Sequence, residues 1–121
     1  MAHRKQSSVH EIQSINEFQE QIHIHDRVVI EYYDKLDPGN PLVDANYTRM
    51  AESADFTDIT FLRVNTAKHP EIKKEARVHR FVPSYQVYYQ GQRGRPVKGI
   101  KPPNITILVR AAQQGVVEFE D

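Results

Sequence analysis

The chain has 121 residues, 16 basic and 16 acidic side chains, and no cysteine. This length suits one domain. A net charge of zero gives no overall field that would attract nucleic acid or an anionic membrane. Without a thiol the chain can form no disulfide, no thiolate metal site and no cysteine nucleophile. The sequence shows no secretory signal and no apolar run of about 18 residues, so we expect a cytoplasmic or nuclear protein.

Strand and helix patterns alternate in the first half of the chain. Ser14 and Glu17 form a capping box at the start of a helix. The run 28–33 is almost continuously apolar and is broken only by Glu31, which is typical of a strand buried on both faces. The elements expected here are an edge strand at residues 9–12, a helix after Ser14 with the apolar stripe Ile15, Phe18 and Ile22, and strands at 28–33 and 59–64.

A second helix is expected between those two strands. Asp37 or Asn40 would cap it, and Pro38 or Pro41 is tolerated only near its start. Its apolar side would consist of Leu42, Val43, Tyr47, Met50 and Ala51.

The second half predicts a short helix at 71–77, a strand at 82–89 and a hairpin loop at 90–95 that returns through 96–98. The stretch 105–112 is ambiguous. Its β-branched residues favour a strand, whereas the preceding Pro102 and Pro103 suit a helix start. A stripe of Ile105, Leu108, Ala111 and Ala112 also favours a helix, which would end at Gly115.

Three stretches in this order resemble the thioredoxin family. They are the strand 28–33 with its following turn, the stretch 61–65 leading to His69 and Pro70, and the segment 78–85 followed by Tyr88, Tyr89 and Gly91. The resemblance covers about residues 9–114. It implies an α/β fold with a central mixed sheet of four to five strands and helices on both faces. It also implies that 105–112 is helical, after Gly99 at the family's usual glycine position. Residues 1–8 would then be a flexible tail and 115–121 an acidic one.

The chain departs from the family at the redox motif. The position of the family's Cys-x-x-Cys motif falls on Asp37, Pro38, Gly39 and Asn40. A carboxylate and an amide cannot form a mixed disulfide, so thiol–disulfide exchange is excluded. We therefore expect a redox-inactive member of the superfamily.

Glu31 is the first candidate for remaining chemistry. The resemblance places it beneath the active-site turn and places Arg63 on the neighbouring strand. A buried carboxylate needs a partner or a proton, so we expect an ion pair between Glu31 and Arg63. This pair would serve stability alone, or Glu31 would be an acid or base poised beneath a pocket.

The second candidate is a groove beside Pro83. The resemblance implies that Pro83 is cis and that the backbone of Val82 is exposed for pairing with an extended peptide. Asp37 would present a carboxylate there, and Tyr33 and Tyr85 would line the groove. Ordinary helix capping by Asp37 and Asn40 is the alternative. The binding residues expected are Tyr33, Asp37, Pro38, Gly39, Asn40, Val82, Pro83 and Tyr85.

Other polar clusters point to no bound group. His23, His25 and Asp26 lie near an expected helix end, where imidazolium is favoured, so capping is preferred to metal ligation. Arg93, Arg95, Lys98 and Lys101 give a basic hairpin edge, which protects against aggregation or contacts an anionic partner. We expect no metal and no cofactor.

Two functions from different classes follow. The first is a redox-inactive module that binds a protein segment in the groove, as a scaffold, chaperone-like or regulatory protein. The alternative is a non-redox enzyme in which Glu31, Asp37 and His79 perform acid–base chemistry on a small molecule. A subunit that associates with another copy through a sheet edge is a third possibility. No nucleic acid or membrane partner is expected.

Overall fold

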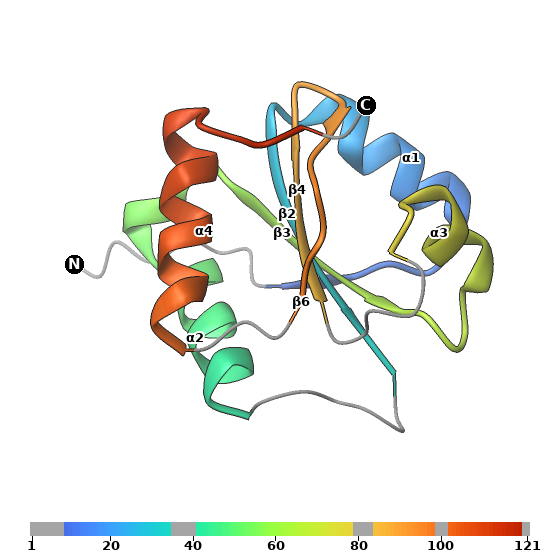
Figure 1. Cartoon of the computed structure of the whole chain (residues 1–121), viewed down its shortest axis with the longest axis horizontal. Coiled ribbons are helices and arrows are strands. Elements are labelled where there is room, and N and C mark those ends of the chain that lie inside the picture. Colours follow the sequence, from blue (N-terminus) through green and yellow to red (C-terminus); the bar gives the residue numbers. More distant parts are fainter. Residues whose placement is uncertain (1–8, 35–40, 79–83, 99–101, 120–121) are drawn as a thin grey trace.

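The computed structural model describes residues 9–34, 41–78, 84–98 and 102–119. They form one mixed sheet between two pairs of helices (Figure 1). The strands are β1 (His10–Glu11), β2 (Arg27–Tyr33), β3 (Thr60–Asn65), β4 (Ser84–Tyr89), β5 (Gln92–Arg93) and β6 (Val97–Lys98). The helices are α1 (Ile15–Ile24), α2 (Pro41–Ala51), the 3₁₀ turn η1 (Ala54–Phe56), α3 (Pro70–Glu75) and α4 (Pro102–Gln114).

The sheet has the order β1-β3-β2-β4-β5, and β6 also pairs with β4. Strands β1, β3 and β2 are parallel, whereas β4 runs antiparallel to β2. Ser84 of β4 pairs with Tyr32 on one side and with Lys98 on the other. The short strand β6 therefore lies at the edge of the sheet beyond β4. The expected architecture of a mixed sheet with helices on both faces is confirmed.

Strand β2 is the centre of the molecule because both of its faces are covered. Val28 and Ile30 pack with residues of α1 and α3, whereas Val29 packs with residues of α2 and α4. Figure 1 shows α2 and α4 on one side of the strands and α1 and α3 on the other. Burial on both faces explains why the run 28–33 is apolar at nearly every position.

Local signals in the sequence explain how α1 begins. The Ser14 hydroxyl accepts a hydrogen bond from the Glu17 amide at 3.1 Å, as a capping box requires. The return bond differs from the standard one, because Glu17 accepts from the Gln13 amide at 2.7 Å. Phe18 and Ile22 are buried as expected.

The buried apolar faces of helices α2 and α4 differ from those expected. In α2, Leu42 is 66% exposed, whereas Val43, Tyr47, Met50 and Ala51 are buried. In α4, the fully buried positions are Ile105, Val109 and Ala112, and Ile107 is 66% exposed. The α4 segment is helical despite its β-branched residues because this face packs against α2 and β2.

Residues after α4 return to the sheet edge. The Arg95 amide donates to the Glu118 carbonyl at 2.9 Å, and Gly94 forms an antiparallel bridge with Phe119. The segment 116–119, called the C-terminal strap below, covers part of the edge formed by residues 92–98. Covering an edge in this way limits pairing with other chains.

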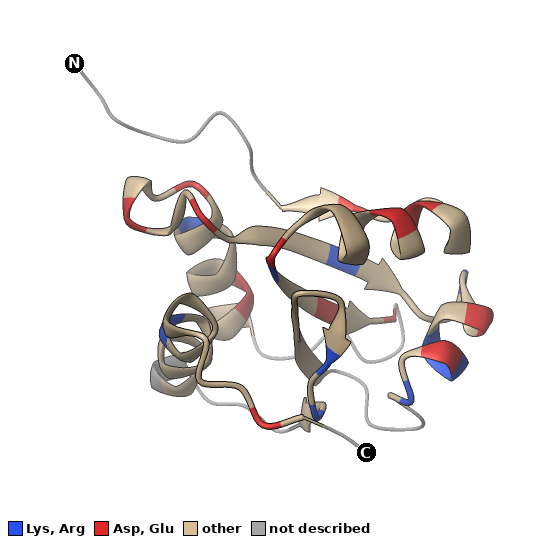
Figure 2. Ribbon diagram, turned by 90° about the horizontal axis from the view of Figure 1, so that it is seen from above, with Lys and Arg blue, Asp and Glu red and all other residues tan. Residues whose placement is uncertain are grey.

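Charges of both signs are mixed along the ribbon (Figure 2). Among the residues that the structure describes, no helix combines the length and apolar character needed to cross a membrane.

Gly115 and Gly91 provide a matched test of the packing that ends α4. Both have positive φ angles, +74° and +80°, so alanine at either position costs about 1 kcal/mol in backbone strain. A Cβ at Gly115 would also lie 3.1 Å from the Tyr89 hydroxyl, whereas at Gly91 the nearest atom is His23 Cδ2 at 3.6 Å. Gly115→Ala should lower the free energy of unfolding by about 2 kcal/mol and Gly91→Ala by about half as much, as measured by urea denaturation. Equal losses would contradict the close packing of Gly115 on Tyr89.

Candidate functional site

The candidate site lies at the carboxyl ends of the parallel strands β2 and β3. Strand β2 ends at Tyr33 and leads to α2 on one face, whereas β3 ends at Asn65 and leads to α3 on the other. This change of face is a topological switch point, the place where open α/β sheets usually bind ligands. Strand β4 starts at this same edge, since Ser84 pairs with Tyr32.

The strand register brings three polar side chains together beneath this edge. Glu31 pairs with Arg63 on β3 and with Tyr85 on β4. Arg63 Nε donates to Glu31 Oε1 at 2.6 Å, and the Tyr85 hydroxyl donates to Oε2. The Glu31 side chain is only 4% exposed. Both oxygens of the buried carboxyl therefore have a donor.

Arg63 links this buried group to the surface. Its Nη2 lies 3.7 Å from Asp44 Oδ1 on α2, and its Cζ lies 4.3 Å from the centroid of the Tyr33 ring. The Arg63 and Asp44 side chains are 31% and 42% exposed. The guanidinium is thus held by a carboxylate on each side and by an aromatic face.

Tyr33 connects strand β1 to the site through a hydrogen bond. Its hydroxyl donates to Glu11 Oε2 at 2.9 Å, and its carbonyl accepts from the Thr66 amide at 2.8 Å. Both contacts fix the end of β2 relative to β1 and to the turn after β3.

Burial raises the pKa of Glu31 to about 7. The nearby Asp44 carboxylate adds to the rise, whereas the hydrogen bond from Tyr85 and the charge of Arg63 oppose it. Burial and the neighbouring Glu31 also raise the pKa of Tyr85, so its hydroxyl remains a donor. Glu31 therefore titrates close to neutral pH although an arginine contacts it.

Several residues expected at the binding groove or in the alternative catalytic site lie outside the described part of the chain. These are Asp37, Pro38, Gly39, Asn40, His79, Val82 and Pro83. Of the two expected groove tyrosines, Tyr33 is partly exposed, whereas Tyr85 is 4% exposed and turns its hydroxyl to Glu31.

Glu31, Arg63, Tyr85 and Asp44 are called the Glu31 cluster below. Sequence reasoning missed the roles of Tyr85 and Asp44 in it. Tyr85 lies 54 residues from Glu31 along the chain, and only the antiparallel register places them side by side. Asp44 reaches Arg63 because α2 packs on this face. The single available signal was the position of Tyr85 two residues after Pro83, at the start of a predicted strand.

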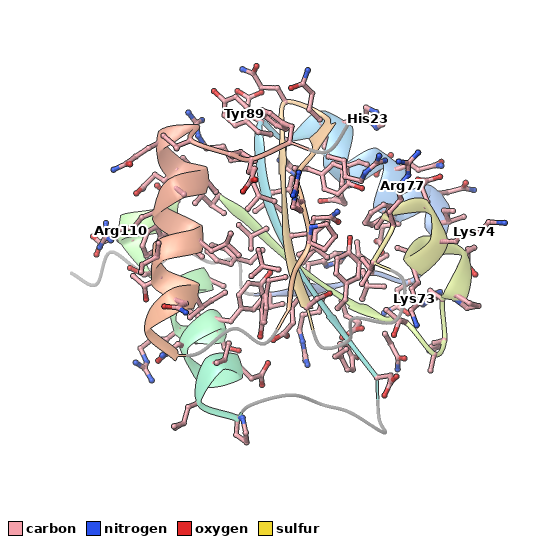
Figure 3. All side chains as sticks on the ribbon, viewed as in Figure 1. His23, Lys73, Lys74, Arg77, Tyr89 and Arg110 are labelled. Atoms are coloured by element: carbon pink, nitrogen blue, oxygen red, sulfur yellow. The ribbon has the colours of Figure 1, made fainter. Side chains whose placement is uncertain are left out.

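The histidines form no common site in the described residues. His23 Nδ1 lies 2.6 Å from the Gln19 carbonyl, and His10 Nε2 lies 3.1 Å from Glu17 Oε2. Figure 3 shows His23 at the end of the molecule opposite the start of α2. Within the described ranges, no group of three His, Cys, Asp or Glu side chains is arranged to hold a metal ion.

Comparison with solved structures identifies the architecture. The chain is similar to the thioredoxin Mala s 13 of Malassezia sympodialis, with a TM-score of 0.77, 17% identity, and 92% of this chain and 98% of the other covered. The chain has the thioredoxin fold. Mitochondrial thioredoxin 3 of Saccharomyces cerevisiae gives a TM-score of 0.73 at 21% identity, with 88% and 94% covered. The oxidised thioredoxin of Plasmodium falciparum gives 0.74 at 18% identity, with 85% and 96% covered.

No family model and no curated protein matches the sequence. The structural similarity therefore establishes the thioredoxin fold, which confirms the resemblance found in the sequence. The absence of cysteine excludes thiol chemistry in this version of the fold.

The titration of Glu31 gives a pH test of the cluster. Its pKa is raised in the folded state, so between pH 4.5 and about 7 the unfolded chain loses this proton while the folded chain keeps it. The stabilisation is complete below pH 4.5 and is lost as pH rises to about 7. Glu31→Gln should remove about 3 kcal/mol of pH-dependent stability over this window, as measured by urea denaturation at several pH values.

Two further variants should change this window in opposite directions. Asp44→Asn removes a charge that raises the Glu31 pKa, whereas Tyr85→Phe removes a hydrogen bond that lowers it. The midpoint of the stability change should therefore move to lower pH in the first variant and to higher pH in the second. Identical profiles in all four proteins would contradict this description of the cluster.

Proposed function

We propose that this chain is a redox-inactive thioredoxin-fold module that binds a protein segment at the switch-point edge, in the groove beside Pro83. Its role would be that of a scaffold, chaperone-like or regulatory protein. The proposal starts from the sequence, because a chain without cysteine can hold a partner by non-covalent contacts but cannot exchange disulfides with it.

The observation that carries the proposal is that the Glu31 carboxyl is shielded from any substrate. Its carboxyl is buried, and Arg63 and Tyr85 occupy its two oxygens. A general acid or base must come within hydrogen-bond distance of its substrate. Glu31 contributes instead to a rigid platform beneath the edge.

Groups at the surface of this edge suit binding. Leu42, in the first turn of α2, is 66% exposed, and the paired side chains of Asp44 and Arg63 are also partly exposed. Protein interfaces commonly combine apolar anchors with polar groups, and this part of the molecule offers both.

The segments that hold the remaining expected groove residues leave from adjacent strands. Residues 35–40 follow β2 in the chain, and residues 79–83 precede β4. The end of β2 and the start of β4 are neighbours, because Tyr32 pairs with Ser84. This proximity supports a shared site for Asp37 and Pro83.

Acid–base catalysis is the second candidate, and one observation favours it. A carboxyl with a pKa of about 7 has the proton affinity that general acid–base catalysis at neutral pH requires. Glu31→Gln separates the two functions, because a binding module would retain peptide affinity in this variant and an enzyme would lose its activity.

Peptide selection tests the binding function. A library of random peptides displayed on phage would be selected on the intact protein, and the affinities of selected peptides measured by fluorescence anisotropy. Pro83→Ala, Asp37→Arg and Leu42→Asp should each weaken binding by about tenfold or more.

The matched control is Asp58→Arg, an exposed acid in the loop before β3, which should leave affinity unchanged. Thermal unfolding of each variant verifies that it is folded. Selected peptides whose binding is the same in all four variants would place the binding surface elsewhere and refute the groove.

A further inference from the structure

A second, apolar site lies on the opposite side of β4 from β2. A half-open cavity of about 370 Å³ lies between α4, the hairpin residues 94–97 and the C-terminal strap. Figure 1 shows α4 and β6 side by side, with the segment after α4 crossing above them. This volume lies within the range of roughly 300–1,000 Å³ that is typical of small-molecule sites.

The cavity walls are aliphatic. Ile107, Leu108 and Ala111 line it from α4, Val97 from β6 and Val116 from the strap. Ile107 and Val116 are 66% and 69% exposed, although both are large apolar side chains. Grouped exposed apolar residues around a concave surface mark a binding site more often than scattered ones.

Among the described lining residues, the cavity has one cationic side chain. Arg95 lines it and is 60% exposed. Its acidic neighbour Glu118 lies 3.9 Å away and is 78% exposed, so this contact is weak and water can replace it. Helix α4 contains no acidic residue, and Asn104 adds an amide to the same wall. An anion at Arg95 would therefore compete with Glu118 alone among the described lining residues.

The sheet edge itself is poorly suited to an added strand. The Arg95 amide already donates to Glu118, and Pro96 has no amide proton. A protein strand that pairs with the edge would meet these two obstacles. A compact ligand that enters the cavity by its apolar part would not.

We propose that this cavity binds a medium-chain carboxylic acid, with the alkyl chain between α4 and the C-terminal strap and the carboxylate on Arg95. Burial of the chain would cover Ile107 and Val116, and the guanidinium would bind the carboxylate through charge-assisted hydrogen bonds. None of these lining residues belongs to the Glu31 cluster, so the site is independent of the proposed peptide groove.

The test is titration of the intact protein with decanoate, and with decanol as the neutral analogue, by isothermal calorimetry below the micellar concentration. Decanoate should bind at least about tenfold more tightly than decanol, because only the acid gains the contact with Arg95.

Two pairs of variants locate the ligand. Ala111→Phe fills the cavity and should abolish binding of decanoate, whereas Gln114→Phe, an exposed position on the same helix outside the cavity wall, should not. Arg95→Gln should weaken decanoate binding by about tenfold and leave decanol binding unchanged. Arg110→Gln is its control. Arg110 lies over the Phe56 ring, and Figure 3 shows it on the side of α4 away from β6.

Three results would overturn the proposal: no binding of decanoate, equal affinities for acid and alcohol, or decanoate affinity that Ala111→Phe leaves intact. Sedimentation velocity over a range of protein concentrations tests whether a second copy of the chain occupies the cavity instead. Self-association that Ala111→Phe abolishes would assign the cavity to a second copy of the chain and also reject the acid.

Discussion

A carboxyl group on the central strand of a sheet that is covered on both faces must be paired or protonated, and this chain uses both solutions. Glu31 has Arg63 on one neighbouring strand and Tyr85 on the other, yet burial still raises its pKa to about 7. The pairing requires β2, β3 and β4 to hold one register. A slip by one residue would turn Glu31 to the opposite face of the sheet, away from Arg63 and Tyr85. The cluster therefore links the stability of the sheet to the geometry of the edge above it.

The thioredoxin fold of this chain does not depend on thiols. The switch point at the ends of β2 and β3 exists because the following helices pack on opposite faces, and it needs no cysteine. Arg63 extends from the buried carboxyl to Asp44 and Tyr33 and so stiffens the surface on which a partner would rest. Preorganisation of this kind reduces the entropy cost of binding.

The C-terminal strap gives the molecule a second surface with different chemistry. The strap is fixed by the Arg95–Glu118 backbone bond and the Gly94–Phe119 bridge, and it turns a helix–sheet junction into a cavity with aliphatic walls. The switch-point edge combines charges with the exposed Leu42, whereas the cavity presents aliphatic side chains and the accessible guanidinium of Arg95. The two surfaces need not share a ligand, since they have no lining residue in common.

The sequence by itself determined most of the elements and the loss of thiol chemistry, because apolar periodicity, caps and composition are local properties of the chain. The fold class and the helical state of residues 105–112 followed from the resemblance to the thioredoxin family, since local patterns left that last segment ambiguous. It also indicated that Glu31 needs a partner, since an acid in an apolar strand is costly wherever the strand lies. Only the tertiary structure decided that Tyr85 shares this carboxyl with Arg63, that Leu42 and Ile107 are exposed, and that the strap borders a half-open cavity. These features depend on strand register and on contacts between residues far apart in the chain, which local patterns do not encode.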